Sequence, residues 1–131
     1  MDNKILVRDF FTAAYTNRDS GFVMRHFTPH YTDHSPLAAR SSAQAAYALS
    51  ELYTQLNPIR ASLVHMAASG DIVAVLVSFT AVHSGPFMGV APTGRTLRWQ
   101  ALEHFRIENG QIAESWGAWP DTQLYAQLTA R

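Results

Sequence analysis

The chain has 131 residues, with ten basic and ten acidic side chains, no cysteine and a net charge of zero. The lack of cysteine excludes disulfides and thiolate metal sites. With no net charge and no basic patch, neither a nucleic acid nor an anionic membrane is expected as a partner. A chain of this length is expected to fold as one domain and to bury about two-thirds of the surface that its unfolded form exposes.

The N-terminal apolar stretch is interrupted by charges, and no apolar run approaches the roughly 20 residues of a membrane span. We therefore expect neither a signal peptide nor a membrane-spanning segment. A cytoplasmic location is the expectation that follows.

The first half of the chain predicts three helices, at residues 2–17, 21–27 and 42–56. Apolar side chains recur at helical spacing. Asp2 or Asn3 is expected to cap the first helix, and the Ser41-Ser42 pair offers a cap for the third. An extended segment that contains Pro36 separates the second helix from the third, because proline disfavours helix at the residue before it.

The second half alternates between apolar and polar residues, which indicates strands. The expected strands cover residues 59–68, 71–83, 97–107 and 111–119. A loop rich in glycine and proline, 84–94, follows the second strand, and Asp121 or Thr122 is expected to cap a short final helix. The sequence thus predicts an α+β domain in which three N-terminal helices pack on a strongly curved antiparallel sheet and leave a cone-shaped cavity.

The Asn109-Gly110 pair between the last two strands predicts a two-residue hairpin, because a type I′ turn needs positive φ at both central residues. Counting outward from this turn pairs Phe105 with Glu114 and Glu103 with Trp116, all on one face. On the third strand this face is apolar except for Glu103. Burying an unpaired carboxylate is costly, so Glu103 is the first candidate for a functional residue.

About two-thirds of the chain resembles the SnoaL-like polyketide cyclase family of the nuclear transport factor 2-like superfamily. The resemblance is carried by the runs GDIVAVLVSFTAVHSGPFMGVAPTGRTL, EHFRIENGQIAESW and LYAQL, and by the upstream YTDHSP. It implies a single domain over residues 1–131, a cofactor-free acid–base reaction such as an intramolecular aldol ring closure, and a homodimer formed through the outer sheet face. The fold also hosts isomerases, epoxide hydrolases, dehydratases and binding modules.

The resemblance further implies a catalytic base four positions after the tryptophan that follows the last hairpin. Here that tryptophan is Trp116, the matching position is Pro120, and Asp121 comes one residue late. A bulge at Gly117 would bring Asp121 inward. Asp121 is therefore either the base or only a helix cap, whereas Glu103 stands where the family often has a polar residue facing the cavity.

His34 and His65 are the candidates for polarising or positioning a substrate oxygen. His34 lies on a connecting segment beside Asp33, which can orient its ring. His65 lies on an apolar strand face and is expected to point into the cavity or into the core. The four-residue spacing of His26, His30 and His34 suits a metal site only on a continuous helix, and the extended segment breaks it, so no metal is expected.

Aromatic residues are expected to line the site or to belong to the ordinary core. They are Trp99, Phe105, Trp116, Trp119, Phe79 and Tyr15. Together these features predict a cofactor-independent polyketide cyclase or related isomerase that acts on a small, largely apolar ligand, with Glu103 or Asp121 moving the proton. The alternatives are an enzyme that opens an epoxide and a non-catalytic module that binds a small ligand or forms a dimer.

Overall fold

The computed structural model describes residues 2–35 and 39–131, so Pro36, which was expected to interrupt helix formation, lies outside the described residues. The N-terminal helical elements are α1 (Asn3–Phe11), its π-helical continuation η1 (Thr12–Thr16), α2 (Gly21–His26) and α3 (Ser42–Gln55). The Asp2 carboxylate accepts a hydrogen bond from the backbone N–H of Lys4, and the Ser41 hydroxyl accepts one from the N–H of Gln44. These caps confirm the predicted helix starts.

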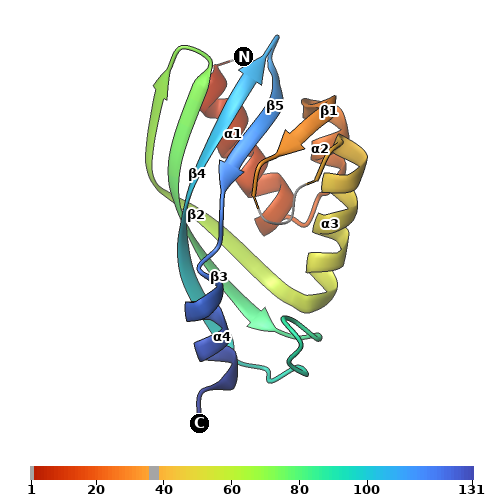
Figure 1. Ribbon diagram of the computed structural model, residues 1–131, viewed down its shortest axis with the longest axis vertical. Coiled ribbons are helices and arrows are strands. Elements are labelled where there is room, and N and C mark those ends of the chain that lie inside the picture. The colour runs from red at the N-terminus through yellow and green to blue at the C-terminus, as the bar shows by residue number, and fades with distance from the viewer. Residues whose placement is uncertain (1, 36–38) are drawn as a thin grey trace.

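In the described part of the chain, one sheet of five strands has the order β1-β5-β4-β3-β2 (Figure 1). The strands are β1 (Phe27–Asp33), β2 (Leu56–Ser69), β3 (Ile72–His83), β4 (Thr96–Glu108) and β5 (Gln111–Gly117). Strands β2 to β5 pair antiparallel as predicted. The predicted count of four is wrong, because β1 joins the sheet in parallel with β5. This strand contains Pro29 and its partner is distant in sequence, so no local pattern indicates the pairing.

The turn between β4 and β5 confirms the predicted two-residue hairpin. Asn109 has φ 49° and Gly110 has φ 77°, the left-handed values that a type I′ turn requires. Glu108 lies opposite Gln111, and the register near the turn is the expected one.

Beyond the turn, a β-bulge changes the register of β5. Ile112 and Ala113 are both buried, and the strand then pairs Glu114 with Arg106 instead of with Phe105. Trp116 lies opposite His104, and Gly117 lies opposite Glu103. The predicted pairs Phe105–Glu114 and Glu103–Trp116 are therefore wrong, and Glu114 does not share the face of Glu103, because an extra residue reverses the alternation.

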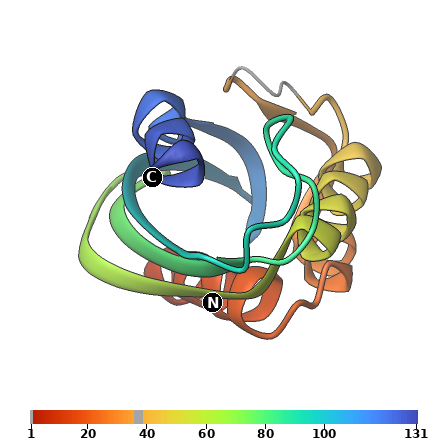
Figure 2. The ribbon, with the colours of Figure 1, turned by 90° about the horizontal axis from the view of Figure 1, so that it is seen from below.

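Seen from below, the strands curl into an open ring with the C-terminal helix α4 (Asp121–Thr129) on one side and α3 with the loop after β3 on the other (Figure 2). Helix α1 packs against the sheet through Phe11, whose ring lies 6.2 Å from that of Phe79 and 5.7 Å from that of Phe105. All three rings are buried. Burial of each side chain of this kind contributes about 1.5–3 kcal/mol to folding.

The final helix α4 (Asp121–Thr129) lies along β4 where β5 no longer covers it. The Gln127 side-chain amide donates to the carbonyl of Arg98 at 2.7 Å and accepts from its N–H at 2.9 Å, while Leu124 and Leu128 are buried. The N-cap of the helix is Pro120, without a side-chain hydrogen bond, so the expected cap by Asp121 or Thr122 is wrong. No helix of the described segments is long and apolar enough to cross a membrane.

Candidate active site

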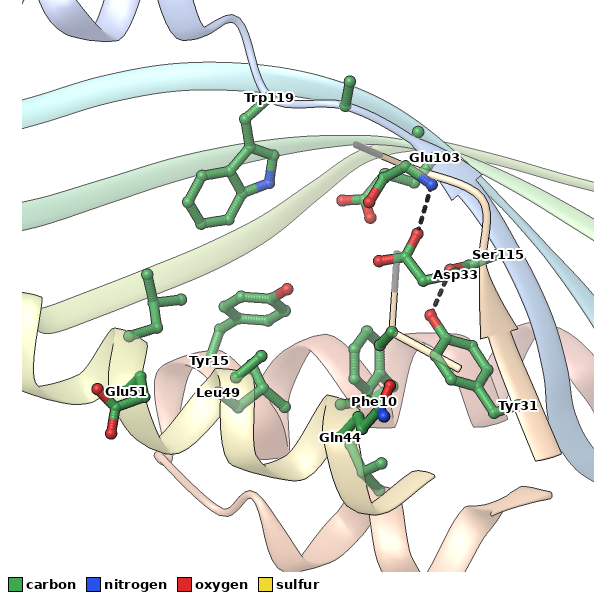
Figure 3. A pocket seen from close by; sticks show the side chains of 18 of the residues that line it. Phe10, Tyr15, Tyr31, Asp33, Gln44, Leu49, Glu51, Glu103, Ser115 and Trp119 are labelled. Carbon is green, nitrogen blue, oxygen red and sulfur yellow. Dashed lines mark hydrogen bonds between the residues drawn. The ribbon is translucent and has the colours of Figure 1, made fainter. Parts of the chain in front are cut away.

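A cavity of about 620 Å³ lies between the concave sheet face and the helices, as the curved fold predicts. Side chains from α1, η1, β1, α3, β4, β5 and the loop after β3 line it. Its volume is within the range of sites that enclose a small organic molecule. Figure 3 shows Glu103, Asp33, Tyr31 and Ser115 gathered at one end of this space, Glu51 at the other end, and Trp119 across from Tyr15.

Glu103 projects from β4 into the cavity (Figure 3). Its Oε2 atom is buried and has no hydrogen-bond partner among the described residues. Burial, and then the nearby negative charge of Asp33, raise the pKa of Glu103 to about 8. The side chain is therefore mostly protonated at neutral pH and can donate a proton or a hydrogen bond to a ligand.

Gly117 provides the space that the Glu103 side chain occupies. Its φ is 153°, and a Cβ atom at this position would lie 2.8 Å from Glu103 Cγ and 2.9 Å from the carbonyl oxygen of Leu102. Only glycine fits there without displacing one of them. The expected bulge at Gly117 lies instead between Ile112 and Glu114, and it is this earlier bulge that brings Gly117 opposite Glu103.

Asp33 is the functional candidate that the sequence analysis missed, having treated it only as a partner of His34. It ends β1, lies opposite Ser115 of β5 and lines the cavity beside Glu103 (Figure 3). Its Oδ1 accepts a hydrogen bond of 2.8 Å from the backbone N–H of Ser35. The only sequence signal is its spacing of two residues from Tyr31, which puts both side chains on one strand face once β1 is known.

Three hydroxyl groups complete the polar end of the cavity. Tyr15 is buried, and its pKa is raised first by burial and then by the charge of Glu103. Tyr31 is hydrogen-bonded to the hydroxyl of Ser115, and burial raises its pKa as well. Together with Asp33 and Glu103 these residues form what we call the acid cluster, of which the sequence predicts only Glu103 and Tyr15 as site residues.

The predicted aromatic residues divide into two layers. Phe105, Trp119 and Tyr15 line the cavity, and Trp116 borders it, although its ring lies on the opposite face of β5, stacked on His34. Phe79 and Trp99 do not line it but pack behind Trp119, with ring centroids 5.2 and 4.8 Å from the Trp119 ring. The inner layer can contact a ligand, and the outer layer supports it.

His34 lies outside the described lining of the cavity, at the edge of the sheet. Its Nε2 is 2.8 Å from Glu114, and its ring stacks on Trp116 at 4.9 Å. Glu114 also accepts a hydrogen bond from Arg106, and these two partners hold the pKa of Glu114 below its usual range. We call these four residues the rim cluster.

His65 is exposed on the outer face of the sheet, so its predicted orientation toward the cavity or the core is wrong. An irregularity between Leu63 and His65 places Leu63 opposite Val77 but His65 opposite Leu76. The extra residue in β2 reverses the alternation from which the prediction was made.

Asp121 borders the cavity but is itself exposed, at the first position of α4. The structure therefore brings Glu103 and Asp33 together and leaves Asp121 in contact with solvent. No group of three or more His, Asp or Glu within residues 2–35 and 39–131 is arranged to hold a metal ion.

The comparisons with known proteins agree with the fold. The curved sheet covered by N-terminal helices is the nuclear transport factor 2-like fold. Within that class, the family model of the SnoaL-like polyketide cyclases matches residues 5–128, so this chain belongs to that family. A search of curated protein sequences found no significant match.

Solved structures superimpose on nearly the whole chain. A SnoaL-like polyketide cyclase candidate from Jannaschia sp. CCS1 has a TM-score of 0.89 at 20% identity, covering 98% of this chain and 92% of its own. AclR from Streptomyces galilaeus, described as a candidate hydroxylase, has a TM-score of 0.86 at 26% identity, with coverages of 96% and 94%. IdmH from Streptomyces antibioticus, described as a candidate polyketide cyclase, has a TM-score of 0.86 at 22% identity, with coverages of 98% and 99%.

Proposed function

We propose that this protein is a cofactor-independent cyclase or isomerase that moves a proton on a small, largely apolar, polyketide-like carbonyl compound. The observation that carries the proposal is the Glu103 carboxyl, whose Oε2 is buried without a hydrogen-bond partner in the described part of the chain, whose raised pKa of about 8 keeps it mostly protonated at pH 7, and which faces an aromatic cavity beside Asp33. Two carboxyl groups with different protonation states supply an acid and a base at the same pH. Membership of the polyketide cyclase family supports the same kind of reaction.

In the proposed reaction, the substrate carbonyl oxygen accepts hydrogen bonds from Glu103 and Tyr15. Asp33 removes a proton from the adjacent carbon, and the electron pair of that C–H bond forms the C=C bond of an enolate whose charge rests on the hydrogen-bonded oxygen. For a ring closure, the enolate carbon then bonds to a second carbonyl carbon of the same molecule, and the proton returns from Asp33 to the new alkoxide. For an isomerisation, the proton returns to another carbon.

The walls of the cavity assist by excluding water. Phe10, Phe105 and Trp119 line it, and hydrogen bonds to a developing charge are stronger in a dry site than in solvent. Asp121 is the second candidate for the base, because it borders the same cavity. His34 and His65 lie outside the described lining and have no role in this proposal.

The test is the exchange of α-protons of 2-tetralone in D₂O, followed by NMR. Glu103→Gln should slow enzyme-dependent exchange by about 10²–10⁴-fold and leave 2-tetralone affinity nearly unchanged. Asp33→Asn should slow it as much, whereas Asp121→Asn should not. Glu108→Gln, an exposed acid outside the lining, is the matched control. Equal losses of affinity and stability in Glu103→Gln would make this residue structural and would contradict its catalytic role.

An epoxide-opening reaction is the second candidate, and the pairing of a protonated carboxyl with a carboxylate favours it. Glu103 would protonate the epoxide oxygen while Asp33 takes a proton from the attacking water or hydroxyl, which forms the new C–O bond as the epoxide C–O bond breaks. Incubation with styrene oxide and NMR detection of the diol separates this reaction from enolisation. Diol formation without exchange of 2-tetralone protons would select it.

We also propose that the protein forms a homodimer through the outer sheet face. Leu102 is 69% exposed at the centre of that face, and Val64 on β2 is 45% exposed. Leu102 lies opposite the half-buried Leu76 of β3, so the two side chains belong to one apolar area of this face. A contiguous exposed apolar patch commonly marks a protein–protein interface. Light scattering should give twice the chain mass of 14.6 kDa, and Leu102→Glu should return the protein to the monomer mass.

A further inference from the structure

The charges that line the cavity all have one sign. Asp33, Glu51, Glu103 and Asp121 border it, and no Lys, Arg or His is present among its described lining residues. The chain as a whole has equal numbers of basic and acidic residues, so its cations lie elsewhere. A low-dielectric cleft lined by one sign of charge concentrates ligands of the opposite sign and repels those of the same sign.

Aromatic rings form the other part of the wall. Phe10, Tyr15 and Trp119 line the cavity near Asp33 and Glu103 (Figure 3), and Phe105 lines it as well. The faces of such rings attract a cation that lies within about 6 Å of their centroids, because the ring quadrupole is negative there. Carboxyl groups and aromatic faces together are the chemistry by which proteins recognise organic ammonium groups.

We propose that the cavity binds an aromatic or polycyclic compound that carries an ammonium group, with the cation held beside Asp33 and Glu103. This inference concerns the same cavity as the proposed function but does not depend on its proton transfer to or from carbon. It assigns a ligand class by charge: organic cations bind, neutral compounds of the same shape bind less tightly, and carboxylates are rejected.

Cation binding should be coupled to the titration of Glu103. In the absence of a cation the side chain keeps its proton up to about pH 8, because burial and Asp33 disfavour its ionised form. The other titratable groups that interact with it are Tyr15 and Tyr31, and neither supplies a positive charge. A bound cation favours the ionised form, so at pH 7 binding should release up to one proton, and affinity should rise as the pH approaches and passes 8.

The test uses three probes of similar size measured by calorimetry: phenyltrimethylammonium, its neutral isostere tert-butylbenzene, and benzoate. The quaternary ammonium does not titrate, so any pH dependence belongs to the protein. At pH 9 we expect it to bind about tenfold more tightly than tert-butylbenzene, with no binding of benzoate. In buffers of different ionisation enthalpy, proton release should be seen at pH 7 and should vanish well above pH 8.

Variants locate the cation. Glu103→Gln and Asp33→Asn should each reduce the preference for the ammonium probe over tert-butylbenzene, and Glu103→Gln should abolish the proton release. Unchanged affinity for tert-butylbenzene would show that each variant is folded, and Glu108→Gln should behave like the wild type. Equal affinity of the two isosteres in the wild type, binding of benzoate, or an ammonium preference that survives both variants would overturn the proposal. If the wild-type protein prefers the ammonium probe but does not exchange the protons of 2-tetralone, this inference stands and only the proposed function is contradicted.

Discussion

Glu103 and Glu114 belong to the same β-hairpin, yet their surroundings are opposite. Glu114 is held by His34 and Arg106 at the rim, and both lower its pKa. Glu103 faces the cavity, its Oε2 has no partner in the described part of the chain, and its pKa is raised to about 8. The bulge after Ile112 separates them. It places Glu114 on one face of β5 and Gly117 on the other, and the missing side chain of Gly117 leaves room for Glu103.

The difference between the two glutamates separates a charged group that stabilises the fold from an acid that is kept for function. The rim cluster satisfies its charges and therefore stabilises the fold, although modestly, because its side chains are partly exposed. The acid cluster retains a buried acid whose ionisation is unfavourable. A fold that tolerates such a group gives up stability, and proteins generally do so where the group has a function.

The largest expected effect is on the pH dependence of stability. A carboxyl whose pKa rises from 4.5 in the unfolded chain to about 8 in the folded one binds its proton more tightly when folded. The free energy of unfolding should therefore fall between pH 5 and 8, by on the order of 4 kcal/mol from this group. Urea unfolding at pH 5 and pH 9 measures it. Glu103→Gln should remove this dependence and Glu114→Gln should keep it; an identical dependence in wild type and Glu103→Gln would refute the assignment.

The next effect concerns the space beside Glu103. Gly117→Ala should cost about 2–3 kcal/mol of unfolding free energy, because the new Cβ meets Glu103 Cγ and the backbone adopts a φ that side chains avoid. Gly110→Ala is the matched control, with a φ of 77° but no atom within 4 Å of the Cβ that alanine would add, and should cost about 1 kcal/mol. Differential scanning fluorimetry compares the two. Equal losses would mean that Gly117 matters only for its backbone conformation.

The smallest effect is expected at the rim. Glu114→Gln should lower the free energy of unfolding at pH 7 by about 0.5–1 kcal/mol, because it removes an ion pair with Arg106 that is only partly buried. The pKa of Glu114 is lowered by folding, so its contribution is present above pH 4.5 and is lost as the pH falls through the folded value. Exchange of 2-tetralone protons should be unchanged. A loss of exchange activity in Glu114→Gln would show that the rim cluster contributes to the reaction, and would contradict the distinction drawn between Glu114 and Glu103.

Much of the fold could be predicted because its signals are local. The caps at Asp2 and Ser41, the Asn109-Gly110 turn and the apolar row interrupted by Glu103 depend on residues close in sequence, and the structure confirms each of them. The sequence predicts Glu103 as a site residue because one acid interrupts the apolar face of a single strand. This signal depends on the alternation within β4 alone, so it holds even where the pairing of the neighbouring strand is predicted wrongly.

The missed features depend on contacts between distant segments or on bulges. Asp33 enters the site only because β1 pairs in parallel with β5, which no local pattern reveals. The orientation of His65 was wrong because one extra residue in β2 exchanges the two faces. The adjacent apolar residues Ile112 and Ala113 break the alternation of β5 and are the one sequence signal for its bulge.

The most direct test of this account is the pKa of Glu103, measured by carbon-detected NMR titration with Glu103→Gln to assign the signal. The structure predicts a value of about 8, which should fall when phenyltrimethylammonium is bound. A value near the ordinary 4.5, unaffected by ligand, would contradict the claim that the cavity holds a neutral buried acid.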